Sequence, residues 1–189
     1  MAAHTPQLSL ATHLQSTKAP WTSLLVLKTG QRAESLVEVP GGFVLKILRG
    51  GKCRTTAGLF AEFAQALDFP DYFGQNWDAL EECLADLEWL PAKGYALLLT
   101  SAELVLPDDE EDYATFLEVM SDAGEAWGSG QAGMGAKRAK PFHVVLAVAE
   151  GDKSKRAHWG LEEIVAQPCR ESETKRLPRE TPPPRKTKR

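Results

Sequence analysis

Apolar and polar residues alternate along the middle of the chain in a way that predicts strands separated by helices. Three apolar runs have the length of buried strands: FVLKILRG at 43–50, GYALLLTSAELV at 94–105 and FHVVLAVAE at 142–150. Between the first two, TTAGLFAEFAQAL at 55–67 repeats its apolar residues at helical spacing behind a threonine that can cap the helix. This order predicts an α/β fold with a small three-stranded, mostly parallel β-sheet packed with α-helices.

Two further helices are predicted. The first follows a loop that Pro70 and Gly74 mark, and Asn76 is a good N-cap for it. Its apolar residues lie on one stripe, which consists of Leu80, Cys83, Leu84 and Leu87. The second helix, DYATFLEVMSDAGEAW at 112–127, precedes the last apolar run.

The two ends of the chain differ from this middle part. Residues 1–42 are predicted to be an N-terminal extension that can contain short strands, because WTSLLVLKTG and SLVEVPGG are both apolar enough. Residues 150–189 are basic and rich in proline, and 170–189 carry eight Lys and Arg against three Glu, with few apolar residues. Such a segment cannot bury a core of its own. We therefore expect a folded domain at 43–149 and a disordered tail at 150–189.

Charge is unevenly distributed along the chain. The formal net charge is only −4, yet residues 57–127 contain seventeen Asp and Glu and a single cation, Lys93. Three cysteines lie far apart without CxxC spacing, which disfavours a disulfide framework and a zinc site: Cys53, Cys83 and Cys169. No apolar run is long enough to span a bilayer, and the start lacks the pattern of a secretory signal. We therefore expect a cytoplasmic protein without a membrane segment, metal or cofactor.

A ridge of carboxylates marks the helix that follows Asn76. At i, i+4 spacing the ridge consists of Asp78, Glu82 and Asp86, with Glu81 beside them. Like-charged neighbours of this kind cost roughly 0.2–0.5 kcal/mol each in an isolated helix, so the simplest alternative is a solvated face. Large aromatic residues next to unpaired charge favour a protein interface instead, and three lie here: Tyr72, Phe73 and Trp77. Trp77 can also simply continue the apolar stripe.

The segment 70–84, PDYFGQNWDALEECL, closely resembles the signature of the barstar-like ribonuclease inhibitors, in which Pro-x-Tyr-Tyr-Gly-x-Asn-x-Asp-Ala-Leu precedes the binding helix. The matching residues are Pro70, Tyr72, Gly74, Asn76, Asp78, Ala79, Leu80, Cys83 and Leu84. The resemblance runs without gaps from near Leu48 to this helix, and more loosely to about Ala149. It implies a compact α/β fold with three parallel strands, whose acidic helix and preceding loop plug the active site of a small basic ribonuclease.

The resemblance also implies which residues contact the partner. They are Tyr72, Phe73, Gly74, Asn76, Trp77, Asp78, Glu81, Glu82 and Asp122, with no catalytic residue among them. The family's central phosphate-mimicking Asp aligns with Glu82, the Trp before it with Glu81, and a later interface Trp with Leu87. The implied function is that of an intracellular antitoxin or immunity protein whose partner is a basic ribonuclease or a related nuclease toxin. We expect a monomer that binds no nucleic acid directly.

Two other functions stay open from the residues alone. Paired carboxylates can act as general acid and base or hold Mg²⁺ in a hydrolase, although all four histidines lie outside the acidic segment 57–127. The basic tail can bind RNA, although the acidic body repels a polyanion. The tail can also cover the acidic face of its own chain, to which it is tethered.

Overall fold

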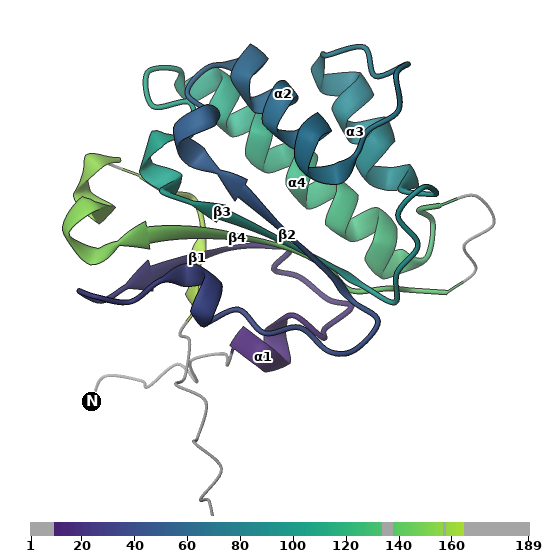
Figure 1. Ribbon diagram of the computed structural model, residues 1–189, viewed down its shortest axis with the longest axis horizontal. Coiled ribbons are helices and arrows are strands. Elements are labelled where there is room, and N and C mark those ends of the chain that lie inside the picture. The colour runs from purple at the N-terminus through teal and green to yellow at the C-terminus, as the bar shows by residue number, and fades with distance from the viewer. Residues whose placement is uncertain (1–9, 134–137, 157, 165–189) are drawn as a thin grey trace, which may run out of the picture.

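Five strands, all paired in parallel, form the sheet at the centre of the fold (Figure 1). The computed structural model describes residues 10–133, 138–156 and 158–164 of the chain. The strands lie in the order β2-β3-β4-β1-β5. Their bounds are β1 (Thr22–Leu27), β2 (Val44–Arg49), β3 (Tyr95–Thr100), β4 (Phe142–Ala149) and β5 (Glu162–Ile164).

The expected number of three strands is wrong for this chain. The three predicted strands are present as β2, β3 and β4, but β1 and β5 extend the sheet beyond β4. β1 comes from the N-terminal 42 residues and pairs with β4, so that Leu24 lies opposite Leu146. β5 has only three residues and pairs with β1. So short a strand has no periodicity for a sequence pattern to detect.

Three helices of the described chain cover one face of the sheet, and a short helix lies against the other face (Figure 1). The three are α2 (Thr56–Leu67), α3 (Trp77–Asp86) and α4 (Glu110–Ser129), and the short one is α1 (Leu10–His13). A side chain caps each of the three by accepting a backbone N–H bond, as the sequence predicted for Thr55 of α2 and Asn76 of α3. The 3₁₀ helices are η1 (Ala33–Ser35), η2 (Gly50–Lys52), η3 (Ala102–Leu104) and η4 (Glu150–Lys155). Residues 150–156 and 158–164, which we assigned to the tail, thus include η4 and β5.

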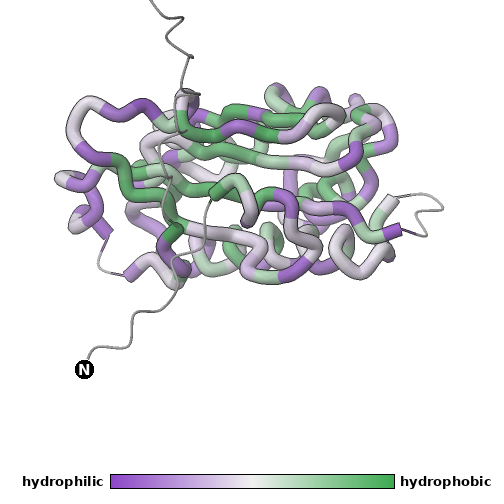
Figure 2. The backbone as a smooth tube through the Cα atoms, turned by 90° about the horizontal axis from the view of Figure 1, so that it is seen from below, coloured by the Kyte–Doolittle hydropathy of each residue, from purple (hydrophilic) through white to green (hydrophobic). Residues whose placement is uncertain are grey.

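Two apolar clusters bury the two faces of the sheet. Leu97 and Leu99 of β3 belong to the larger cluster, which the residues of α2, α3 and α4 complete. Leu98, between them, points to the smaller cluster, which also contains Leu14 and Ile164. Figure 2 shows the strands as largely green, hydrophobic segments. Because Leu14 and Ile164 come from outside 43–149, the flanking segments contribute to the buried core.

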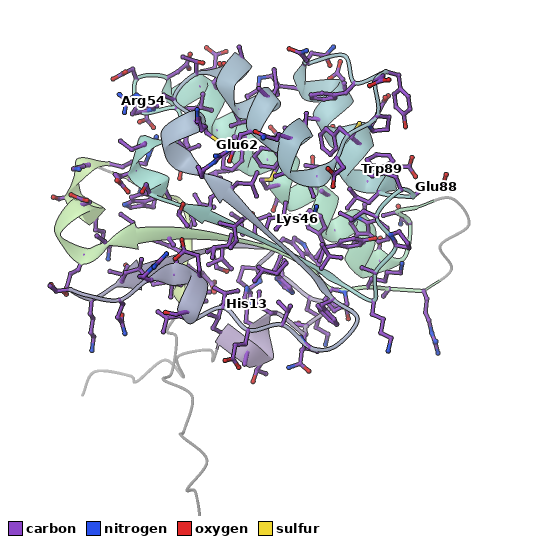
Figure 3. The ribbon with its side chains drawn as sticks, in the orientation of Figure 1. His13, Lys46, Arg54, Glu62, Glu88 and Trp89 are labelled. Atoms are coloured by element: carbon purple, nitrogen blue, oxygen red, sulfur yellow. The ribbon has the colours of Figure 1, made fainter. Side chains whose placement is uncertain are left out.

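β2 forms an edge of the sheet and is only half-buried, whereas its sequence predicted a buried strand. β3 pairs with one side of β2, and Ile47 is 44% exposed. Two ion pairs connect β2 to α2 and its C-cap: Lys46 binds Asp68 at 3.1 Å, and two guanidinium nitrogens of Arg49 bind the carboxylate of Glu62 at 2.8 Å. Figure 3 labels Lys46 and Glu62. The backbone N–H of Arg49 also donates to Glu62, at 2.9 Å. Apolar content alone does not reveal strand order, which explains the error.

Two histidines are buried between the N-terminal segment and the sheet. His13 and His143 are 1% and 0% exposed, and their ring centroids are 4.4 Å apart. His13 Nε2 lies 3.0 Å from Ser23 Oγ, and His143 Nε2 lies 2.7 Å from the carbonyl oxygen of Ser16. Burial lowers the pKa of both rings, and the neighbouring His143 helps to lower the pKa of His13 to about 4. Both rings are therefore neutral at pH 7.

We expect the protein to lose stability as the pH falls below about 6.5. Unfolded histidine takes up a proton near pH 6.5, whereas folded His13 does so only near pH 4. The unfolded state therefore binds more protons within this window, and the stability that is present above it is lost progressively toward pH 4. His13 alone accounts for a loss of about 3 kcal/mol at the lower end. Urea denaturation at a series of pH values measures the free energy of unfolding.

Other groups also titrate in this range, so the matched variant is His13→Gln, which keeps a polar side chain beside Ser23. Its free energy of unfolding should depend on pH less steeply than that of the parent between about pH 6 and pH 5, by close to one proton. Identical slopes would show that burial of His13 does not contribute to acid sensitivity.

Candidate functional site

An acidic surface forms where loop 68–76 meets α3. Asn76 Oδ1 accepts the N–H of Ala79 at 2.8 Å, so α3 begins at Trp77. Before the cap, Gln75 has a positive φ of 51°, which turns the chain into the helix. The apolar stripe of α3 is buried, as the sequence predicted, in Leu80, Cys83, Leu84 and Leu87. With that stripe against the core, the carboxylate ridge faces away from it.

The carboxylates of the ridge have no compensating charge within α3. Asp78, Glu81 and Glu82 are exposed. Asp78 lies in the first turn, where the helix dipole stabilises a negative charge. Asp86 lies in the last turn, where the dipole disfavours it; it is half-buried, and its Oδ1 is buried without a hydrogen-bond partner.

One acidic residue of each neighbouring helix, α2 and α4, provides a contrast. Glu62 of α2 binds Arg49, whose hydrogen bonds hold the pKa of Glu62 below its ordinary value. Glu110 of α4 binds Arg156 at 2.9 Å. None of the ion pairs within residues 10–133, 138–156 and 158–164 involves a carboxylate of α3. The α3 ridge therefore keeps its charge available to a cation from outside.

The three aromatic residues beside the ridge differ in exposure. Tyr72 is 72% exposed. Phe73 and Trp77 are half-buried and meet Phe60 of α2 edge-on, with ring centroids 6.1 and 5.1 Å away. Trp77 Nε1 also donates to Asp112 Oδ1 at 3.2 Å. Phe73 and Trp77 thus help to hold the loop and α3 in place, whereas Tyr72 is largely exposed.

Tyr72 shares the negative potential of the C-terminal half of α3. Desolvation raises the pKa of its phenol, and Cys83, Asp86 and Glu88 raise it further. Burial and the carboxylates of Glu82 and Asp86 likewise raise the pKa of the Cys83 thiol. Figure 3 shows Glu88 at the outer end of this region. The phenol is therefore protonated at pH 7 and can donate a hydrogen bond beside the carboxylates.

The other expected residues occupy three positions around the ridge. Gly74 is exposed in the loop, where a Cβ would lie 3.3 Å from Asn76 Nδ2 and so crowd the cap. Asp122 is exposed on α4, which packs beside α3 (Figure 1). Leu87 is 1% exposed and caps α3 with a φ of 46°, so it cannot contact a partner. The expected residues therefore lie on loop 68–76, α3 and α4, and their role in binding stays a prediction.

Asp112 is a site residue that the sequence did not reveal. It lies in the first turn of α4, where Oδ1 accepts from Trp77 at the start of α3 and Oδ2 lies 2.5 Å from Thr56 Oγ1 at the start of α2. The carboxylate thereby joins the first turns of three helices. The sequence placed Asp112 only at the start of the predicted helix 112–127, because its contacts span 35 and 56 residues.

In the part of the chain that the structure describes, no group of three or more His, Cys, Asp or Glu is placed to hold a metal ion, and no helix has the length and apolar character needed to cross a membrane.

A protein-family model matches a region of the chain that includes loop 68–76, the Asn76 cap and the acidic helix α3. The family model described as "Barstar (barnase inhibitor)" matches residues 43–147. This chain belongs to the barstar family. The match extends from the start of β2 into β4 and includes α2, α3 and α4, whereas β1 and β5 lie outside it. A comparison with curated proteins found no match.

Charge removal should have opposite effects on α3 and α2. We expect Glu82→Gln to leave the free energy of unfolding unchanged or to raise it by about 0.2–0.5 kcal/mol, because repulsion along the ridge decreases. Glu62→Gln, the matched control, should lower it by about 1.5–3 kcal/mol, because the charge-assisted bonds to Arg49 are lost. Urea denaturation of both variants measures the difference, and a Glu82→Gln variant as unstable as Glu62→Gln would make Glu82 a structural residue.

Loss of the Asp112 carboxylate should loosen the junction of the three helices. We expect Asp112→Ala to lower the free energy of unfolding by about 1–3 kcal/mol, since Trp77 Nε1 and Thr56 Oγ1 both lose a partner. Glu111→Ala removes an equal charge from the same helical turn without these contacts and is the control. Equal urea midpoints for the two variants would show that the contacts of Asp112 with Trp77 and Thr56 do not stabilise the fold.

Proposed function

We propose that this barstar-family protein binds a basic ribonuclease and blocks its active site with loop 68–76 and α3. The observation that carries the proposal is the exposed ridge on α3, whose carboxylates form no ion pair among the described residues. The family's description as barnase inhibitor supports the same role. The proposed contacts are Tyr72, Phe73, Gly74, Asn76, Trp77, Asp78, Glu81, Glu82 and Asp122.

The proposed inhibition is phosphate mimicry. A ribonuclease binds a polyanion, so its active site presents cationic side chains that recognise phosphate oxygens. Asp78 and Glu82 lie on adjacent turns of α3 and present carboxylate oxygens to the same kind of donor. Tyr72, at the edge of the ridge, excludes water from these contacts once a partner covers it, and desolvation strengthens each charge pair.

The compartment and biological role belong to the same proposal. Cys53 and Cys83 are buried free thiols, which suits a reducing cytoplasm. There the protein acts as an antitoxin or immunity protein, a monomer that protects RNA from a nuclease without binding RNA itself. The protein is then an inhibitor and not an enzyme.

Two of the described histidines cannot support the hydrolase alternative. Catalytic carboxylates work with a second group that shifts their proton affinity or holds substrate. His13 and His143 are buried on the face of the sheet opposite α3, so neither can serve the ridge.

We predict that barnase, the enzyme named in the family description, binds this protein and that each carboxylate affects a different rate constant. Asp78→Ala and Glu82→Ala should raise the dissociation rate, weakening binding by about 2–5 kcal/mol, because cations of the enzyme are left buried and unpaired. Asp122→Ala, at the rim, should mainly slow association. Association of the parent should also slow as salt increases, because screening shortens the steering field. Surface plasmon resonance at low and high salt separates these rates.

Glu162→Ala is the control, since it removes one exposed charge from β5, at the opposite end of the sheet from β2. It should leave the dissociation rate unchanged. If Asp78 and Glu82 can both be removed with less than about tenfold loss of affinity, roughly 1.4 kcal/mol, the ridge is not the binding site. If neither barnase nor any of a panel of basic ribonucleases binds at low salt, inhibition itself is wrong.

A further inference from the structure

A second charged site lies at the carboxyl edge of the sheet and shares no residue with the ridge. A pocket of about 250 Å³ is lined by the last residues of three strands: Leu27 of β1, Thr100 of β3 and Ala149 of β4. The carboxyl edge of a parallel sheet is where open α/β folds usually bind ligands. The contacts proposed for inhibition include none of the residues that line this pocket.

The pocket has excess negative charge. Its charged lining residues are Arg32, Glu34, Glu103 and Asp152. Arg32 lies 3.8 Å from Glu34, and Asp152 binds Lys155 at 2.9 Å. No ion pair of the described residues includes Glu103. One carboxylate of the pocket thus lacks a cation in direct contact.

Glu103 is the unusual member of this group. The residue is only 9% exposed, and its Oε2 is buried without a hydrogen-bond partner. Lys155 interacts with Glu103 electrostatically, but its ammonium hydrogen-bonds to Asp152. A buried carboxylate oxygen without a donor is costly, so a cation that enters the pocket gains a strong interaction.

The pocket walls suit a long cationic side chain. Leu27, Ala33, Ala147 and Ala149 provide apolar surface next to the carboxylates. Lys and Arg bury their methylene stems on such surface while the charged head reaches a polar partner. The pocket therefore has the chemistry to receive an ammonium or guanidinium group.

Strand β5 ends near this edge of the sheet. β5 runs parallel to β1, and Ile164 lies opposite Leu25, two residues before the end of β1. β5 thus points toward the same edge as the pocket. Ile164 also shares its apolar cluster with Ala33 and Ala147, which line the pocket. The first cation of 170–189 is six residues beyond Ile164, a reach of roughly 20 Å when extended.

We propose that a Lys or Arg of residues 170–189 docks in the pocket at the carboxyl edge and pairs with Glu103. This segment has eight cations against three Glu, so its charge complements that of the pocket. The pocket lining includes no residue of α3. In this arrangement the acidic ridge stays open to a partner, in contrast to a tail that covers it.

NMR spectroscopy of the full chain tests this proposal. The amide chemical shifts of the parent are compared with those of a full-length variant in which the cations of 170–189 are changed to Gln: Arg170, Lys175, Arg176, Arg179, Arg185, Lys186, Lys188 and Arg189. We expect shifts at Ser101, Glu103 and Asp152, with α3 unchanged. Shift changes along α3 would place the segment on the ridge and overturn the proposal, and so would the absence of changes on any folded element.

A second comparison keeps the native tail and removes the carboxylate. In Glu103→Gln, the amide signals of 170–189 should move to the positions that they take in the parent at about 0.5 M salt, where charge pairing is screened. Glu34→Gln, whose carboxylate already lies beside Arg32, is the control and should leave those signals in place. Tail signals that are the same in Glu103→Gln and the parent would contradict pairing with Glu103. If Glu103→Gln does not fold, the variant with the cations of 170–189 changed to Gln still tests the proposal, because it changes no residue of the described fold.

Discussion

A parallel sheet has to be covered on both faces, and the rest of this structure depends on that requirement. β3 and β4 are buried almost throughout, so water must be excluded above and below them. The region that matches the barstar family provides α2, α3 and α4 for one face. Residues on either side of that region complete the other face, where Leu10 and Leu14 from the N-terminal side and Ile164 from the C-terminal side share one cluster. The flanking segments are thus part of how this sheet is buried.

The same division of faces leaves α3 free to carry unpaired charge. Its apolar stripe and the Trp77–Asp112 bond fix the helix from the inside. The exposed carboxylates of Asp78, Glu81 and Glu82 form no ion pair among the described residues, and like charges on one helix face repel each other. Natural proteins often keep such locally unfavourable groups where function requires them.

Sequence patterns revealed what is encoded locally. The caps at Thr55 and Asn76 and the stripe through Leu80 and Leu84 depend on residues three or four apart, and each is confirmed. Strand order depends on pairing between distant segments. Residues 22–27 were apolar enough to be a strand, but nothing nearby specifies that they lie beside β4. For the same reason Asp112 escaped notice at the site, while the acidic ridge, with its fixed helical spacing, could be placed from the sequence.

The edge position of β2 has a consequence for the behaviour of the protein at high concentration. An exposed parallel edge invites a strand from another molecule, which is a route to aggregation. Here the backbone N–H of Arg49 is already bonded to Glu62, so an incoming strand would find this donor occupied. Lys46 and Arg49 also place charged side chains, each in an ion pair, on either side of exposed Ile47, and charged side chains on an edge disfavour the addition of a strand. The ion pairs that fasten β2 to α2 thereby also keep the sheet from growing between molecules.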